Sequence, residues 1–416
     1  MRIHADRLHA ALDALGQIGR YWDPTAELWG VNRLALTPAD GEGRRHVVAR
    51  MQALGLAVTI DAVGNVYGRR AGREDHLAPV MMGSHIDSVP TAGRFDGCLG
   101  VLGGLEILTT LVDAGVTTRR PLVVAFFTDE EGCRFGTDML GSAVATGRLT
   151  PEAVYALRDP DGVRLGDALD AIGFRGPAPV HLAPPHAYLE CHIEQGPMLA
   201  HAGVDIGVVT GVQGISWQEL TLTGRSAHAG TTPMALRRDP GVVAARIQLH
   251  LRDMVASGRY GQLRATMGRL QPFPGLVNIV PGRVICTVDL RNPAESLLVA
   301  AEADLAAFIA QAAAAETVTV TTRQTARTPP VGFTPRLQEA ITAAATALGA
   351  SHQPIVSGAG HDAQEIARIA PTGMVFVPGL YDGISHNPRE LSTPEQCALG
   401  VDVMLQVVMD LAEEPE

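Results

Sequence analysis

The 416-residue sequence has few of the features that mark disulfide-stapled, membrane-spanning or nucleic-acid-binding proteins. Its five cysteines are scattered and form no CxxC pair, so neither a disulfide framework nor a structural zinc knuckle is supported. It has no run of about 18 consecutive apolar residues that could span a bilayer. Its net charge of −11 at pH 7 disfavours a nucleic-acid backbone as a partner.

Aromatic residues are also scarce, at 4 %, so alanine, valine and leucine must supply most of the core. The 46 % of hydrophobic and 19 % of charged residues are ordinary for a soluble globular protein. Residues 1–10 form a charged amphipathic segment rather than a signal peptide, which predicts a cytoplasmic location. The chain is longer than one hydrophobic core normally serves, and we therefore expect two domains.

Apolar segments that read as buried strands alternate with segments of helical periodicity through the first half of the chain. This alternation predicts an α/β domain with a mostly parallel sheet covered by helices. The expected helices are 5–20, 42–54, 100–114 and 336–348, and the expected strands are 57–60, 78–82, 121–127, 187–196 and 374–377.

The pattern changes near residues 208–214 and returns after Pro329-Pro330. Between these points it reads strand, helix, strand, strand, helix, at 217–222, 239–257, 262–270, 278–290 and 293–315. We predict a smaller α+β domain at 212–328, inserted into a discontinuous domain of residues 1–211 and 329–416.

Histidines and carboxylates follow three of the predicted strands at the point where each strand ends. His85 and Asp87 follow the first, Glu130 and Glu131 the second, and the alternation of the third puts His192 on one face with its neighbouring glutamates. Ligands of open α/β sheets bind at the carboxyl ends of the strands. Each signal alone is weak, because a lone His-x-Asp usually caps a loop and a Glu-Glu pair usually starts a solvated helix.

Taken together, these positions predict a metal site, with His85, Asp96, Glu131, His192 and His386 as the candidate ligands. Three imidazoles and two carboxylates suit zinc, or manganese, cobalt or nickel. A shared carboxylate such as Asp96 could bridge two ions about 3.5–4 Å apart, and Glu130 could then accept a proton from water. Asp87 is placed to fix the tautomer of His85.

Two alternatives for the ligands stay open. His361 is a rival to His386, because it sits beside Asp362 in a glycine-rich loop and spacing alone does not choose between them. Cys98 and Cys133 lie near the candidate ligands in sequence, but we interpret them as small packing residues rather than soft ligands.

Six motifs in order resemble the hydantoinase/carbamoylase amidase family over nearly the whole chain. They are His85-Ile-Asp87, Gly93-Arg-Phe-Asp-Gly97, Phe127-Thr-Asp-Glu-Glu-Gly-Cys-Arg-Phe135, His192-Ile-Glu-Gln-Gly-Pro197, Ala227-His-Ala-Gly-Thr-Thr-Pro-Met234 and Ser357-Gly-Ala-Gly-His-Asp362. This family belongs to the dinuclear-metal aminoacylase and carboxypeptidase clan. Many clan peptidases have a glutamate where His192 stands, so His192 favours the carbamoylase branch.

The resemblance implies two divalent metal ions per subunit. One would be held by His85, Asp96 and His192, and the other by Asp96, Glu131 and His386, with Glu130 as the general base and Asp87 orienting His85. Clan members also carry a non-proline cis peptide after the bridging aspartate, which predicts one at Asp96-Gly97.

The resemblance further implies that the inserted domain serves as a dimerisation and lid domain, so that the protein would be a homodimer. His228 would stabilise the oxyanion across the dimer interface, although it could also be a packed loop histidine. Asn278 and Arg291 would grip the substrate carboxylate. From the residues alone, Arg291 could instead pair with Asp289.

Gln195 and Gly360 match positions that line the carbamoyl pocket of the family. The implied activity is metal-dependent hydrolysis of the ureido C–N bond of N-carbamoyl-L-amino acids, which gives the amino acid, ammonia and carbon dioxide. Within the family, the alternatives are an allantoate amidohydrolase or a β-ureidopropionase. An aminoacylase or dipeptidase of the same clan and a metal-free binding protein are more distant alternatives, and the intact Glu130 argues against the last.

Overall fold

The computed structural model describes residues 1–415, and the chain divides into two compact units. Unit 1 comprises residues 1–210 and 332–416, and unit 2 comprises residues 211–331. These boundaries lie one and three residues from those expected for the insertion. That unit 2 acts as a dimerisation and lid domain stays a prediction.

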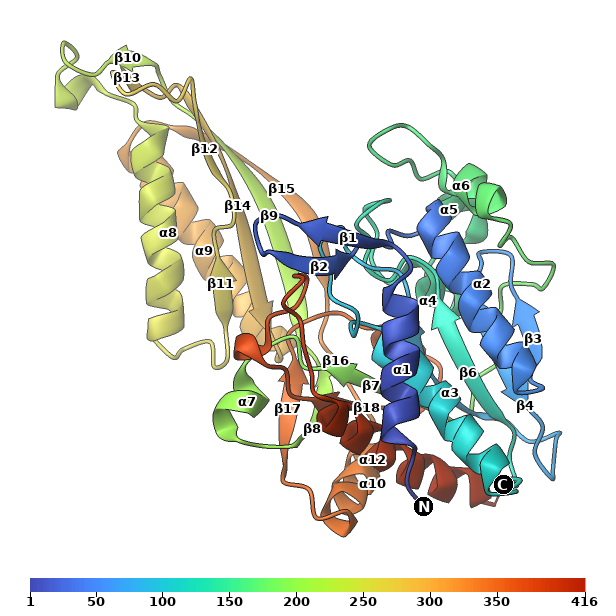
Figure 1. Ribbon diagram of the computed structural model, residues 1–416. Coiled ribbons are helices and arrows are strands. Elements are labelled where there is room, and N and C mark those ends of the chain that lie inside the picture. The colour runs from blue at the N-terminus through green and yellow to red at the C-terminus, as the bar shows by residue number, and fades with distance from the viewer. Residues whose placement is uncertain (416) are drawn as a thin grey trace. The chain divides into compact units, whose positions relative to one another are not determined.

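Unit 1 is built on a nine-stranded sheet in the order β16-β8-β18-β7-β5-β6-β4-β3, with β17 paired to β8 (Figure 1). Its four central strands, β18, β7, β5 and β6, are parallel, and β8, β4 and β3 pair in antiparallel fashion outside them. The predicted mostly parallel α/β fold is therefore confirmed. The strands are β3 (Ala57–Ile60), β4 (Val66–Arg70), β5 (Val80–His85), β6 (Leu122–Phe127), β7 (Ala187–Ile193), β8 (Ile206–Val212), β16 (Val331–Gly332), β17 (His352–Ser357) and β18 (Thr372–Val377).

Every residue of β5, β6, β7 and β18 is buried, which explains why β6 is a continuous apolar run and why even the polar Glu190 and His192 of β7 are shielded from solvent. Helices α3, α10 and α12 pack onto these strands, α1 packs on α3 and α12, and α4 and α11 also pack on the sheet. The helices are α1 (Ala5–Gly16), α2 (Pro38–Ala53), α3 (Cys98–Asp113), α4 (Leu140–Ala145), α5 (Pro151–Tyr155), α6 (Leu165–Ile172), α7 (Met198–Ala202), α10 (Pro335–Ala347), α11 (Asp362–Ile366) and α12 (Pro394–Glu413). A separate hairpin joins β1 (Arg20–Asp23) to β2 (Leu28–Val31).

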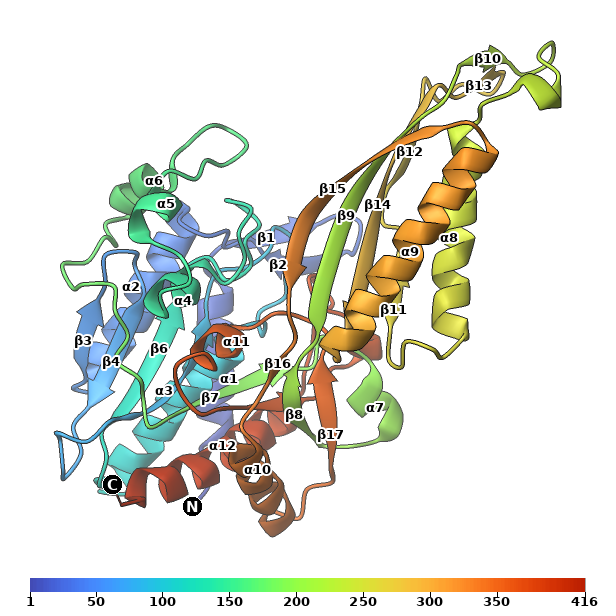
Figure 2. The same cartoon turned by 180° about the vertical axis from the view of Figure 1, so that it is seen from behind.

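Unit 2 has its own antiparallel sheet in the order β11-β14-β9-β15, with β12 also paired to β14, and helices α8 and α9 pack on it (Figure 2). A core of its own joins both helices to β9 and β14. Its elements are β9 (Gly214–Thr223), β10 (Ala227–His228), α8 (Pro240–Ala256), β11 (Arg264–Thr266), β12 (Leu270–Phe273), β13 (Ile279–Val280), β14 (Arg283–Asn292), α9 (Glu295–Ala315) and β15 (Thr319–Thr328).

Two sequence-based expectations for unit 2 are wrong. The strand expected at 262–270 is two strands, β11 and β12, which pair with different parts of β14. The strand β15 was missed because its polar, threonine-rich sequence lies at the edge of the sheet and is mostly exposed, so it lacks an apolar pattern.

The expectation that no segment could span a membrane also needs a correction. Helix α9 is long and apolar enough for this by length and composition alone, and acidic residues had broken its apolar run in the sequence. In the structure it packs in the core of unit 2, yet only 33 % of its most apolar stretch is buried. Much of its apolar surface therefore faces outward.

Candidate metal centre

Three neighbouring parallel strands bring the candidate ligands together. His85 is the last residue of β5 and pairs with Phe127 at the end of β6. His192 is the second-last residue of β7. The chain leaves β6 directly into the segment 128–131. Because the carboxyl ends of parallel strands lie at one edge of a sheet, residues far apart in sequence converge there.

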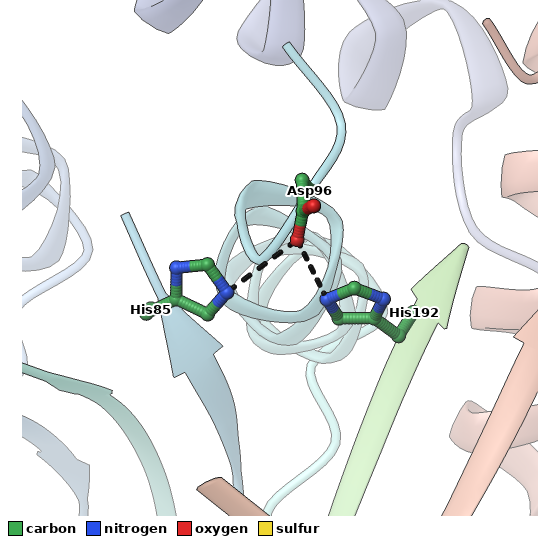
Figure 3. A group of neighbouring side chains, drawn as sticks. All are labelled: His85, Asp96 and His192. Atoms are coloured by element: carbon green, nitrogen blue, oxygen red, sulfur yellow. Dashed lines mark ion pairs between the residues drawn. The ribbon is translucent and has the colours of Figure 1, made fainter. Parts of the chain in front are cut away.

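The first group consists of His85, Asp96 and His192 (Figure 3). Asp96 Oδ1 lies 3.5 Å from His85 Nε2 and 3.1 Å from His192 Nε2. The Nδ1 atoms of the two rings lie 3.0 Å and 2.8 Å from the backbone carbonyl oxygens of Asp87 and Ile193. A carbonyl oxygen can only accept, so in the neutral rings Nδ1 carries the hydrogen and Nε2 is left to bind an ion.

The second group consists of Asp96, Glu131 and His386. His386 Nε2 lies 3.3 Å from Asp96 Oδ2 and 3.4 Å from Glu131 Oε2. In each of the two groups the potential ligand atoms lie within 4.8 Å of one another. His386 is the most exposed member, because its side chain retains 48 % of its accessible surface.

This arrangement fits a pair of divalent ions. The two oxygens of Asp96 face different imidazoles, so its carboxylate is placed to be shared between two sites. Glu131 Oε1 is buried without a hydrogen-bond partner, and a cation would satisfy it. The mixed imidazole and carboxylate donors suit zinc, manganese, cobalt or nickel.

The carboxylates and imidazoles of the site shift one another's pKa values. Burial alone would raise the pKa of Asp96, but hydrogen bonds from the three imidazoles hold it well below its ordinary value. Burial alone would lower the pKa of His85, but Glu130 and Asp96 raise it well above its ordinary value. Burial, together with the nearby Asp96, raises the pKa of Glu131 to about 8. A divalent cation would compete with protons for these groups, so binding should release protons.

Glu130 borders the first group without belonging to it. Its Oε2 lies 3.5 Å from His85 Nε2, and burial is the main cause that raises its pKa well above the ordinary value. It lines a cavity of about 110 Å³ together with Asp96, Glu131, Asp138, Met139, His192, Gln195, Ala359, Gly360, His361 and His386. A buried carboxylate with this raised proton affinity can accept and return a proton.

Asp87 contacts His85 through its backbone rather than through its carboxylate. Its carboxylate Oδ1 lies 3.8 Å from His85 Nδ1, beyond hydrogen-bond distance, whereas its carbonyl oxygen lies at 3.0 Å. The carboxylate instead accepts the backbone N–H groups of Glu130 and Glu131 at 3.3 Å and 3.4 Å. Asp87 thus fixes the segment that carries Glu130 and Glu131, a function that the sequence did not suggest.

Gln195 and Gly360 both line the cavity beside the two ligand groups. Gln195 Nε2 donates to Asp96 Oδ2 at 2.8 Å and lies 3.5 Å from His386 Nε2, while Gln195 Oε1 is buried without a partner. The Nε2 and Oε1 atoms of Gln195 are therefore both close to where a small substrate would bind. Their roles in substrate binding stay predictions.

His361 does not take the place of His386. Its Nε2 lies 2.9 Å from Ser357 Oγ, and its ring lies against that of His192 rather than beside Glu131. His361, His192 and Glu190 form a third group whose potential ligand atoms are close together. The Glu190 carboxylate is already satisfied by the hydroxyls of Ser84 and Tyr188 and by a backbone N–H, so this group offers a poor ion site.

The predicted cis peptide at Asp96-Gly97 is wrong. Among the described residues, only Phe273-Pro274 is cis. The turn after Asp96 is made instead by Gly97, which has a φ of +64° and whose N–H donates to His192 Nε2 at 3.1 Å. The two cysteines near the ligands bind no partner cysteine, and Cys98 Sγ accepts a hydrogen bond from Arg33 at 3.0 Å.

The substrate-contacting residues predicted in unit 2 lie at its two ends: His228 and Asn278 at one, and Arg291 at the other. His228 pairs with Ile279 in the short β10–β13 ladder, and the carbonyl of Asn278 accepts the N–H of the residue that follows His228. Arg291 lies near the end of β14, where its guanidinium pairs with Asp289 at 2.9 Å. The pairing with Asp289, which the sequence had left open, is therefore present.

Two residues that contact Asp96 were missed in the sequence. Ser385 Oγ lies 3.0 Å from Asp96 Oδ2, and the Glu390 carboxylate accepts the backbone N–H of Asp96 at 3.2 Å. The only available signal was their place in Ser385-His-Asn-Pro-Arg-Glu390, around the predicted ligand His386.

Comparisons with known proteins give a consistent result. Residues 81–410 match the peptidase family M20/M25/M40. The chain is 41 % identical over 412 residues to an N-carbamoyl-L-amino-acid amidohydrolase of Rhizobium meliloti, which covers 99 % of this chain and 97 % of the relative. It is 34 % identical over 385 residues to the allantoate amidohydrolase of Bacillus subtilis (strain 168), which covers 92 % of this chain and 93 % of the relative.

A solved structure agrees with these sequence relatives. An amidase of the hydantoinase/carbamoylase family from Burkholderia multivorans superposes with a TM-score of 0.94 at 43 % identity. The match covers 100 % of this chain and 99 % of that one.

Proposed function

The chain belongs to the peptidase family M20/M25/M40 and, within it, to the hydantoinase/carbamoylase amidases, and from this premise we propose its substrate and the roles of its residues. The family predicted from the six motifs is confirmed, as is a hydrolase acting on amide C–N bonds. We propose that it cleaves the ureido C–N bond of N-carbamoyl-L-amino acids. The observation that carries this proposal is the meeting of His85, Asp96 and His192 beside Glu130, which lies 3.5 Å from His85 and lines one cavity with Asp96 and His192.

The family is metal-dependent, and two ions per subunit are part of the proposal. His85, Asp96 and His192 would hold one ion, and Asp96, Glu131 and His386 the other. When bound, such ions polarise the ureido carbonyl and lower the pKa of a water molecule.

Glu130 is the proposed general base. Its buried carboxylate takes a proton from the attacking water and delivers it to the nitrogen that leaves the carbonyl carbon. Hydrolysis of R–NH–CO–NH₂ by one water gives the amine R–NH₂, ammonia and carbon dioxide. Gln195, which lines the same cavity, is placed to hydrogen-bond the carbamoyl group, and the absence of a side chain at Gly360 leaves room for it.

Arg291 and Asn278 are proposed to bind the substrate carboxylate, and His228 to stabilise the oxyanion. Within one copy of unit 2, these residues do not meet. Arg291 lies eight positions after Arg283 along β14, which is roughly 27 Å at about 3.4 Å per residue. The β10–β13 pair with His228 lies beyond the Arg283 end (Figure 1). One small substrate can therefore contact both only if two copies of the chain contribute.

Unit 2 has a surface suited to such a dimer. Strand β15 is an edge strand, and a groove of about 840 Å³ runs between it and α9. Small or apolar residues form much of its lining: Ala303, Ala306, Ile309, Ala310, Ala313 and Val320. Edge strands and exposed apolar helix faces are surfaces that proteins cover by association. We propose a homodimer formed through this groove.

The substrate is tested by measuring ammonia released by metal-reconstituted protein from N-carbamoyl-L-methionine, N-carbamoyl-β-alanine and allantoate. We expect the highest kcat/KM on the first, and loss of activity with a chelator. Preference for allantoate would support the alternative that the relative from Bacillus subtilis represents. Failure on all three by protein with bound metal would contradict a ureido substrate and point to N-acyl amino acids or dipeptides. A cytoplasmic location is part of the same proposal.

A further inference from the structure

The segment 380–391 contacts Asp96 through Ser385 and Glu390 and also through the proposed ligand His386. We propose that Glu390 in this segment is a positioning residue that ties Asp96 to the segment and keeps the Ser385 hydrogen from Asp96 Oδ2, where an ion would bind. This inference rests on the metal centre proposed above and adds a residue that is not itself a ligand.

Glu390 is fully engaged by neutral donors. Its Oε1 accepts the backbone N–H groups of Phe95 and Asp96 at 3.0 Å and 3.2 Å, and its Oε2 accepts the hydroxyl of Ser385 at 2.7 Å. It is 5 % exposed and belongs to none of the three groups of potential ligands. A carboxylate with both oxygens occupied in this way holds a loop rather than an ion.

Ser385 has one hydrogen and two carboxylate oxygens within reach. Its Oγ lies 2.7 Å from Glu390 Oε2 and 3.0 Å from Asp96 Oδ2. Gln195 Nε2 already donates to Asp96 Oδ2 at 2.8 Å, so this oxygen has only one further lone pair for an ion, and it stays available when the Ser385 hydroxyl donates to Glu390 instead. The carboxylate of Glu390 thus removes a hydrogen that would compete with an ion for the same oxygen.

The surrounding backbone holds Glu390 in place. A Cβ at Gly93 would lie 2.5 Å from Glu390 Cβ and 2.6 Å from its Oε1, so only glycine leaves the carboxylate this space. The N–H of Leu380 donates to the carbonyl of Leu391 at 2.7 Å, which closes the segment at its two ends. The segment therefore carries Glu390 and His386 as one fixed unit.

Replacing Glu390 with glutamine makes a distinct test, because the amide changes which way the hydroxyl points. The glutamine Oε1 can still accept the two backbone N–H groups, while its NH₂ would donate to Ser385 Oγ. The hydroxyl hydrogen would then turn to Asp96 Oδ2 and compete with the ion there. Removing the hydroxyl with Ser385→Ala in the same chain should abolish this competition.

The experiment titrates metal-free protein with Zn²⁺ against a chromophoric chelator, with the bound metal counted by elemental analysis. We expect wild-type protein to bind two ions, and Glu390→Gln to weaken one site about tenfold, within the 10–100-fold range of outer-shell partners. The double variant Glu390→Gln/Ser385→Ala should recover most of that loss. Glu390→Ala should weaken both sites, because Asp96 is shared.

Glu106→Gln is the matched control. Glu106 is also buried, at 3 % exposure, and holds the backbone N–H of His4 at 3.0 Å, but it is remote from both ligand groups. It should leave both affinities unchanged. Wild-type affinities in Glu390→Gln, or a loss that Ser385→Ala does not reverse, would overturn the positioning role. Wild-type protein that binds no divalent ion would overturn the metal centre itself, and this role with it.

Discussion

Replacing Gly97 with alanine should disrupt the metal centre through a single methyl group. Gly97 has a φ of +64° and a ψ of −44°, a sparsely populated combination outside the left-handed helical region that costs a residue with a side chain about 1–3 kcal/mol. Its Cβ would also lie 2.5 Å from three ring atoms of His85, among them Nε2. Ordinary contact begins at 3.4 Å, so the ring must move by about 0.9 Å. Metal–ligand distances tolerate only about 0.2 Å, and the ring would therefore leave coordination distance.

The chain offers a matched control at Gly115. Its φ is +65°, and a Cβ there would meet nothing within 4 Å. Gly115→Ala should therefore lower the free energy of unfolding by about 1–2 kcal/mol without touching a ligand. Comparing the two variants separates a general loss of stability from damage at the metal ligands.

The assay is Zn²⁺ affinity of each variant by competition, combined with urea unfolding of the metal-free proteins and with kcat/KM. We expect Gly97→Ala to lose more than about 100-fold in affinity at one site, since a lost ligand should exceed the effect of an outer-shell partner. Gly115→Ala should bind metal as the wild type does. Equal metal affinities in the two variants would refute the reasoning, whatever their stabilities.

Three further predictions concern the base, the carboxylate site and the dimer. Glu130→Gln should lower kcat by about 10²–10⁴-fold while both ions still bind, because Glu130 is not a ligand; a kcat within threefold of the wild type would contradict its role as base. Arg291→Ala should raise KM for N-carbamoyl-L-methionine but leave rates on its carboxamide unchanged, and equal losses on both substrates would argue against carboxylate recognition. Ala306→Glu in the groove of unit 2 should give monomers in light scattering, whereas the neighbouring exposed Ala307→Glu should stay dimeric; a dimeric Ala306→Glu would exclude this groove as the interface.

The elements that could be predicted from sequence are those with one strong local pattern. Strands β5 and β6 are buried on both faces, so their apolar runs are visible without an alignment. Strand β15 was missed, since an exposed edge strand packs little and carries no such pattern. The 262–270 segment was misread because its pairing is decided by β14, not by its own residues.

Within the site, sequence identified the kinds of residue but not their contacts. Asp87 was correctly placed next to His85, yet its carbonyl contacts the ring and its carboxylate holds the segment of Glu130. The cis peptide expected after Asp96 is absent, because a positive φ at Gly97 makes the turn. Backbone conformation at a single residue depends on the packing around it, which a motif does not specify.

The sequence by itself determined the family, the alternation of buried strands and helices, and the ligand types at the strand ends. These features are local, since each follows from a few consecutive residues and the physics of burying them. Only the tertiary structure decided that His386 rather than His361 stands beside Glu131, and that Glu390 holds Asp96. Glu390 and Asp96 lie 294 positions apart, and such a contact exists only once the sheet has brought two distant loops to one edge.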